Sequence, residues 1–154
     1  MLYLSLKLIH ILCATLVFGT GIALAILGTQ VFRSQNPSLI SDTGSRILKL
    51  ELYLTVAGTV GLLGTGSIML ILTDFALLQA WLIWALLLLM LAAACWLAGL
   101  SLQHAMLNLA KQSLAQATSL PASYQGYLNR WLLLGLPSTL AMTGIFYLMV
   151  FKPA

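Results

Sequence analysis

Long apolar runs, separated by short polar connections, dominate the chain. The four apolar segments lie at about 2–29, 50–73, 79–108 and 129–151. Each is at least as long as the roughly 17–25 residues that a helix needs to cross the hydrocarbon core of a bilayer. The pattern therefore predicts an all-α fold, an integral membrane four-helix bundle in which residues 1–154 form a single transmembrane domain.

The polar connections run from Thr29 to Lys49, around Asp74, and from Ala110 to Arg130. The first contains the turn signal Asn36-Pro37, followed by three N-cap candidates for the second helix, Ser41, Asp42 and Thr43. Neither long connection is long enough to form a domain. We therefore expect little of the chain to lie outside the bilayer.

The composition supports a membrane location. Charged residues make up 6% of the chain and hydrophobic residues 61%, whereas a soluble domain carries about 25% charged residues. Seven Lys and Arg against three Asp and Glu give a net charge of +4. No basic stripe is interleaved with aromatic residues, so we expect the lipid bilayer and no nucleic acid as a partner.

The positions of the basic residues predict an orientation. They concentrate in the first and third connections, and the positive-inside rule places such connections in the cytoplasm. Both termini are then expected on the outer, periplasmic side of a bacterial inner (plasma) membrane. The first segment is expected to be a mature helix, because Lys7 stands inside the apolar run, which exceeds a signal-peptide core of roughly 7–15 residues.

One histidine lies deep in the first segment. At a rise of about 1.5 Å per residue, His10 lies about 12 Å from the outer end, beyond easy reach of water. A buried imidazole needs a hydrogen-bond partner, a metal ion or a water-filled cavity. A carbonyl or threonine hydroxyl of a neighbouring helix is one alternative, and a cofactor is the other. His104 lies near the inner face, so the two histidines are not expected to share one porphyrin.

The second segment carries a strip of small residues at every third position, Gly58, Gly61, Gly64 and Ser67. Such a strip either lets two helices approach closely or leaves room for a flat ligand beside His10. A b-type haem needs such a slot, an axial ligand, and cations near the membrane surface for its propionates. His10 is therefore the candidate axial and metal ligand, Lys7 a propionate partner, and Gly61 and Gly64 the walls of the slot. Candidates for a sixth ligand are Met69, Met90 and Met142.

Other polar and aromatic residues have simpler interpretations. Side chains at the inner ends of the helices are expected to reach the headgroups and anchor the bundle; they are Arg46, Lys49, Glu51, His104 and Arg130. Trp81 and Trp84 are expected in the outer aromatic belt. Cys13 and Cys95 lack the spacing of a metal site or a disulfide pair and are interpreted as small buried hydrophobes.

The pattern Lys7-x-x-His10 resembles the first helix of the membrane-bound protoporphyrinogen oxidase family, HemJ, and of its relatives around the copper-resistance protein CopD. Arg130, Pro137 and Lys152-Pro153 resemble the same group near the other end. Over its whole length the chain is similar to a bacterial family of predicted integral membrane proteins of unknown function.

The HemJ resemblance implies a b-type haem bound through His10, with Arg130 as a further cofactor-binding candidate. It also implies a redox partner in the membrane, such as quinone or a respiratory complex. Those oxidases have a lysine and a further histidine in the third helix, where this chain reads "WLIWALLLLMLAAACWLAGL". Oxidase activity is therefore not carried over.

Three functions follow as hypotheses. The first is a small inner-membrane protein that binds haem b through His10 in electron transfer or haem handling, in its enzymatic form a haem-dependent membrane oxidoreductase. The second is a non-catalytic structural or assembly subunit of a larger membrane complex. The third is a transport component for copper or a small solute. The sequence contains no hydrolase, phosphate-loop or metalloprotease motif.

Overall fold

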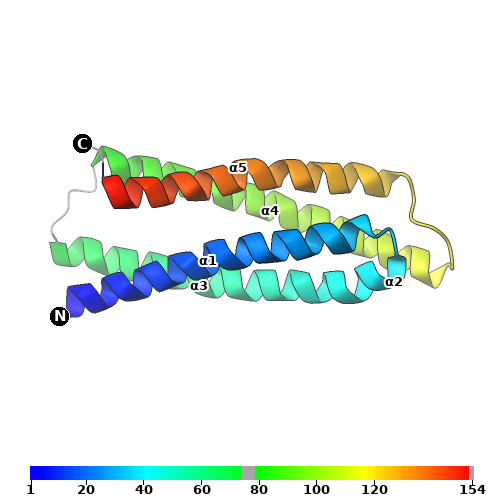
Figure 1. Cartoon of the computed structure of the whole chain (residues 1–154), viewed down its shortest axis with the longest axis horizontal. Helices are drawn as coiled ribbons and strands as arrows, with labels where there is room; N and C mark the ends of the chain where they lie inside the picture. The colour runs from blue at the N-terminus through cyan, green and yellow to red at the C-terminus, as the bar shows by residue number, and fades with distance from the viewer. Residues whose placement is uncertain (74–78, 153–154) are drawn as a thin grey trace.

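The computed structural model describes residues 1–73 and 79–152, without the side chain of Thr73. The described residues form helices and contain no strand, which confirms the all-α prediction (Figure 1). The elements are α1 (Leu2–Arg33), α2 (Pro37–Leu39), the π-helical turn η1 (Ile40–Gly44), α3 (Ser45–Thr73), α4 (Ala80–Ala115) and α5 (Ser123–Phe151). Four helical runs are long and apolar enough to cross a membrane, one of them continuing from α2 through η1 into α3.

The second long helix begins at Pro37, well before the apolar segment predicted to start near residue 50. Asn36 is its N-cap, because Asn36 Oδ1 accepts hydrogen bonds from the backbone N–H groups of Ser38 at 3.1 Å and Leu39 at 3.4 Å. Proline is also suited to the first helical position, where its missing N–H is not needed. Ser41, Asp42 and Thr43, which we predicted as caps, lie within the π-helical turn instead.

The helices form two hairpins (Figure 1). The N-terminal hairpin consists of α1 packed on η1 and α3, with α2 directly before η1, and the C-terminal hairpin consists of α4 packed on α5. Both chain termini lie at one end of the molecule, the terminal end, and the connections 34–36 and 116–122 lie at the other, the loop end. Within the described residues, contacts between the hairpins are far fewer than contacts inside each one. Which side of the membrane the terminal end faces stays a prediction.

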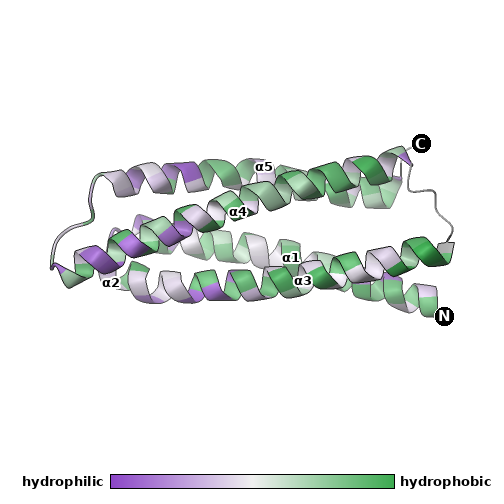
Figure 2. Cartoon of the chain, turned by 180° about the vertical axis from the view of Figure 1, so that it is seen from behind, coloured by the Kyte–Doolittle hydropathy of each residue, from purple (hydrophilic) through white to green (hydrophobic). Residues whose placement is uncertain are grey.

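The helices extend past the apolar band at the loop end. Stretches without Asp, Glu, Lys or Arg extend over residues 8–32, 52–72, 80–110 and 131–151. Each is long enough to span the roughly 30 Å of a hydrocarbon core, which takes about 20 helical residues. Hydrophilic residues gather beyond these stretches, toward the loop end (Figure 2). Polar residues at the loop end therefore continue the helices instead of forming loops, so the helices extend further at this end than the apolar segments predicted from the sequence.

The loop end also holds the packed core. A cluster of ten buried residues, here called the loop-end core, consists of Val31, Phe32, Ile40, Ile47, Leu48, Met106, Leu107, Ala110, Tyr124 and Leu128. Five members lie beyond the apolar stretches just described, and the other five, Val31, Phe32, Met106, Leu107 and Ala110, lie in the loop-end parts of the stretches of α1 and α4. Burial from water drives apolar side chains together only where helices extend beyond the hydrocarbon, since inside a bilayer the lipid tails are as apolar as leucine. The loop-end core is therefore the main connection between the hairpins.

One buried hydrogen bond joins α5 to α1 in this core. Tyr124 Oη donates to the carbonyl oxygen of Phe32 at 2.9 Å. Replacing Tyr124 by phenylalanine leaves that carbonyl unpaired and is expected to destabilise the fold by about 1–3 kcal/mol. Thermal unfolding in detergent should show a lower midpoint for this variant and no change for Tyr53→Phe, which alters an exposed ring. Equal midpoints for the two variants would show that the Tyr124 bond contributes nothing.

Candidate functional site

His10 is fixed by a hydrogen bond across the N-terminal hairpin. Its Nδ1 lies 2.9 Å from Thr65 Oγ1. The Thr65 hydroxyl donates its single proton to backbone carbonyls of its own helix, at 2.6 Å to Gly61 and 3.3 Å to Leu62. The hydroxyl can therefore only accept from the imidazole, which places the histidine proton on Nδ1. The lone pair of the neutral ring is then on Nε2.

The sequence left two alternatives for the partner of the His10 imidazole, a hydrogen-bonding group on a neighbouring helix or a cofactor. The Thr65 hydroxyl agrees with the first of them. At about 1.5 Å per residue, counting inward along the second apolar segment places residues 64–69 at the depth of His10. Thr65 lies in this stretch. The ring lies against α3, since a methyl group built on Gly66 would come 3.3 Å from His10 Cε1. The side chain is partly buried. This bond occupies Nδ1, so a ligand bound by this ring would have to bind at Nε2.

The small-residue strip of α3 divides into two parts. A methyl group built on Gly61 would lie 2.6 Å from Cys13 Sγ, and one on Gly58 would collide with Val17. These two glycines therefore let α1 and α3 approach closely, and Gly61 has no room beside it for the predicted slot. Gly64 is exposed, and a methyl group there would meet nothing within 4 Å.

The predicted propionate partners lie at opposite ends of the molecule. Lys7 is exposed and lies one helical turn from His10 toward the terminal end. Arg130 is exposed near the loop end, about 32 Å along α5 from its last residue, whereas His10 lies about 12 Å from the start of α1. The structure brings Lys7 and His10 together and separates Arg130 from both. Met90, one of the three candidate sixth ligands, is 70% exposed, and Met69 and Met142 are partly buried.

The residues near His10 offer a single imidazole as a possible ligand. No group of three or more His, Cys, Asp or Glu residues that could hold a metal occurs in the part of the chain described. A haem brings four nitrogen ligands of its own and needs one axial side chain, which His10 Nε2 can provide. Histidines that bind a metal through one ring nitrogen usually donate a hydrogen bond from the other, as the Nδ1 of His10 does here. Cys13 and Cys95 are free and partly buried.

A second polar cluster joins the hairpins at the level where the apolar stretch of α3 begins. Glu51 of α3 accepts two hydrogen bonds from α4, one from Trp96 Nε1 at 3.1 Å and one from Gln103 Nε2 at 2.9 Å. Glu51 and Trp96 are partly buried, and Gln103 is 1% exposed. Both donors are neutral groups. Gln103 Oε1 is buried and has no hydrogen-bond partner among the described residues.

Sequence reasoning placed Glu51 among the headgroup anchors and did not find its partners. Arg46, Lys49, His104 and Arg130 are exposed at the loop end, as an interfacial role requires. Glu51 differs because α4 covers it. The available signal was an acidic residue directly before the apolar stretch of α3, but nothing in the spacing indicates that it meets Trp96 and Gln103.

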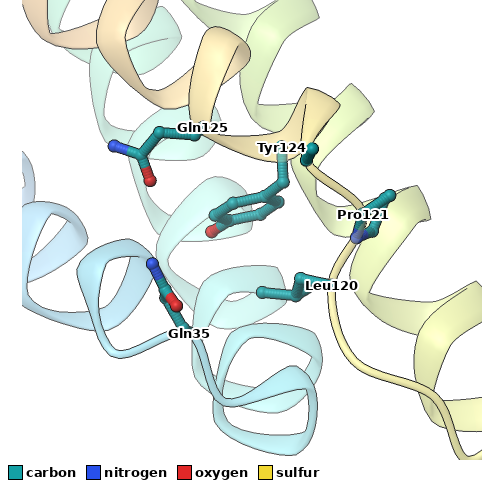
Figure 3. A pocket seen from close by; sticks show the side chains of 6 residues that line it. Gln35, Leu120, Pro121, Tyr124 and Gln125 are labelled. Atoms are coloured by element: carbon teal, nitrogen blue, oxygen red, sulfur yellow. The ribbon is translucent and has the colours of Figure 1, made fainter.

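A pocket of about 160 Å³ opens at the loop end (Figure 3). Its lining residues are Gln35, Leu120, Pro121, Ala122, Tyr124 and Gln125. They include no charged or metal-ligating side chain, and the Tyr124 hydroxyl already donates to Phe32. We assign no function to this pocket.

Comparison with known proteins gives a family and no closer relative. A family of predicted integral membrane proteins matches residues 4–153. No curated protein and no solved structure matches the chain significantly. The resemblance of His10 and Lys7 to HemJ and CopD stays a prediction from the residues. Because the family match covers nearly the whole chain and the four long apolar helices agree with it, the protein belongs to the family described as "Predicted integral membrane protein (DUF2269)".

Proposed function

We propose that this membrane protein binds a b-type haem near its terminal end, with His10 as an axial ligand, and that it acts in electron transfer or haem handling. The observation that carries the proposal is the hydrogen bond from His10 Nδ1 to Thr65 Oγ1. It fixes the ring on α3 and leaves Nε2 with its lone pair.

The neighbouring residues have separate roles in this proposal. Thr65 orients the ring and keeps the proton on Nδ1, since its own proton is held by the backbone. Lys7 lies one turn nearer the terminal end, where an ammonium group can pair with a propionate at headgroup level. Gly64 leaves the adjacent surface of α3 without a side chain. A bound haem would supply one-electron chemistry, for which quinone or a larger membrane complex is the proposed partner.

The test is a reduced-minus-oxidised spectrum of protein purified in mild detergent from haem-replete cells. Wild-type protein is expected to show a sharp b-type band after reduction with dithionite, and His10→Ala to lack it. Thr65→Val keeps the shape of the side chain but removes the acceptor for Nδ1. We expect it to weaken haem retention by about 10–100-fold, as is usual for a group that orients a metal ligand.

His104→Ala is the matched control, because His104 is exposed and lies near the loop end. It is expected to keep the full band. A colourless wild-type preparation, or a band that persists in His10→Ala, would overturn the proposal. Metal analysis of the same samples distinguishes haem iron from copper, which the transport hypothesis requires.

A further inference from the structure

The second polar cluster lies at the boundary of the apolar band. Glu51 directly precedes the apolar stretch of α3 that begins at Leu52, and Gln103 of α4 lies at the same level because it donates a hydrogen bond to Glu51. In a bilayer that covers this stretch, the cluster lies at the level of the lipid headgroups. It also lies between the hairpins, because Glu51 belongs to one and its two donors belong to the other.

The cluster has more acceptors than donors. The Glu51 carboxylate receives one hydrogen bond on each oxygen, both from neutral groups, so no cation among these partners balances its charge. Gln103 is 1% exposed, and its amide oxygen has no partner among the described residues. A partly buried carboxylate without a cation and a buried carbonyl without a donor both carry a cost. One positively charged group that carries N–H donors would relieve both.

We propose that Glu51 and Gln103 bind a primary ammonium group at headgroup level, as carried by phosphatidylethanolamine. The ammonium pairs with the Glu51 carboxylate, which is partly accessible, and donates a hydrogen bond to Gln103 Oε1 beside it. The indole of Trp96 adjoins the carboxylate and gives the cation an aromatic surface. An inorganic cation such as Mg²⁺ would need several waters to complete its six oxygen ligands, because the cluster offers three, whereas an ammonium group needs only acceptors for its N–H groups.

The source of the ammonium follows from its level in the membrane. The acyl chains of a headgroup lipid would lie along the apolar stretches of α3 and α4. Its phosphate would lie at the level of exposed basic residues such as Lys49 and Arg130. A free small amine offers the same recognition chemistry without the chains. The experiment therefore includes both.

The probe is an equal mixture of phosphatidylethanolamine and phosphatidylcholine with identical acyl chains, added to delipidated full-length protein and read by native mass spectrometry. Both lipids carry one positive nitrogen and one phosphate, but only ethanolamine has N–H donors. Wild-type protein is expected to retain phosphatidylethanolamine about tenfold over phosphatidylcholine, from one additional hydrogen bond to a charged group. Glu51→Gln is expected to bring the ratio close to one.

Asp42→Asn is the matched control, since it removes an exposed carboxylate at the same end of the molecule, and it is expected to keep the preference. Gln103→Met removes the unpaired amide oxygen while keeping a side chain of similar length, and it should lower the ratio even if Glu51→Gln fails to fold. In a second arm, ethanolamine is titrated into wild-type protein in phosphatidylcholine nanodiscs and the unfolding temperature is measured.

A preference for phosphatidylethanolamine that depends on Glu51 supports the lipid source. A rise in unfolding temperature with ethanolamine, without any lipid preference, supports the ammonium site with a free amine as its ligand. Equal retention of both lipids together with no response to ethanolamine overturns the proposal. Stabilisation by sodium chloride equal to that by ethanolamine overturns it as well, because the site would then bind inorganic cations.

Discussion

Replacing Phe32 by alanine is expected to lower the free energy of unfolding by about 3–5 kcal/mol. The ring is 0% exposed and packs edge-on against Trp131, with ring centroids 5.4 Å apart. It also fills the space beside Gly44, where a built methyl group would lie 3.1 Å from it. Because Phe32 is fully buried in the loop-end core, the loss includes the contribution of burying the whole ring. The cavity left behind adds to this loss.

Thermal unfolding in detergent, followed by circular dichroism, measures this effect. Leu133→Ala is the comparison, because Leu133 is 67% exposed within the apolar stretch of α5 and faces lipid or detergent. It should change the unfolding midpoint little, since its side chain stays in an apolar solvent whether the bundle is assembled or not. A drop of similar size in both variants would mean that the loop-end core does not hold the hairpins together.

The second large effect is expected from Gly61→Leu. A side chain at Gly61 meets Cys13 Sγ, because even the first carbon would lie 2.6 Å from that atom. Helix α1 must then move away from α3, with an expected cost of about 1–3 kcal/mol or more. The same movement would separate His10 from Thr65, whose hydrogen bond is 2.9 Å long in the close-packed hairpin. We therefore expect lower stability together with loss of the proposed haem band.

Gly64→Leu is the matched control for stability, because it introduces the same side chain one helical turn away, where nothing lies within 4 Å. Its unfolding midpoint should stay near that of wild type. Labelling of Cys13 with a membrane-permeant thiol reagent, in a Cys95→Ala background, should be faster in Gly61→Leu than in wild type. Unchanged labelling and stability in Gly61→Leu would show that α1 and α3 are not packed as described.

The all-α architecture could be predicted from the sequence because the hydrophobic pattern is strong. Runs of about 20 apolar residues leave a helix as the only spanning structure whose backbone groups are all satisfied, apart from a closed barrel. The ends of the helices could not be predicted from hydropathy. Asn36 starts a helix that the apolar pattern would place near residue 50, because a local cap and a proline act independently of hydropathy.

The candidate site was predictable only in part, for a similar reason. Depth along a helix follows from residue number, so the facing of His10 and residues 64–69 could be anticipated. Rotation about the helix axis and the choice of neighbour do not follow from one sequence. Gly61 and Gly64 look equivalent in the strip, yet one contacts Cys13 and the other is open. Glu51 and Gln103 are 52 positions apart, and only the packing of the hairpins brings them together.

The pairing of helices with their neighbours in the chain has a consequence for biogenesis. Helix α1 packs on α3 and α4 packs on α5, so each partner follows closely behind the other during synthesis. The first pair can complete its lateral contacts while the ribosome is still making the second. The two hairpins then have to pack together at their loop ends, around the loop-end core. A substitution that disrupts this core should leave two hairpins that are inserted in the membrane but not packed on each other.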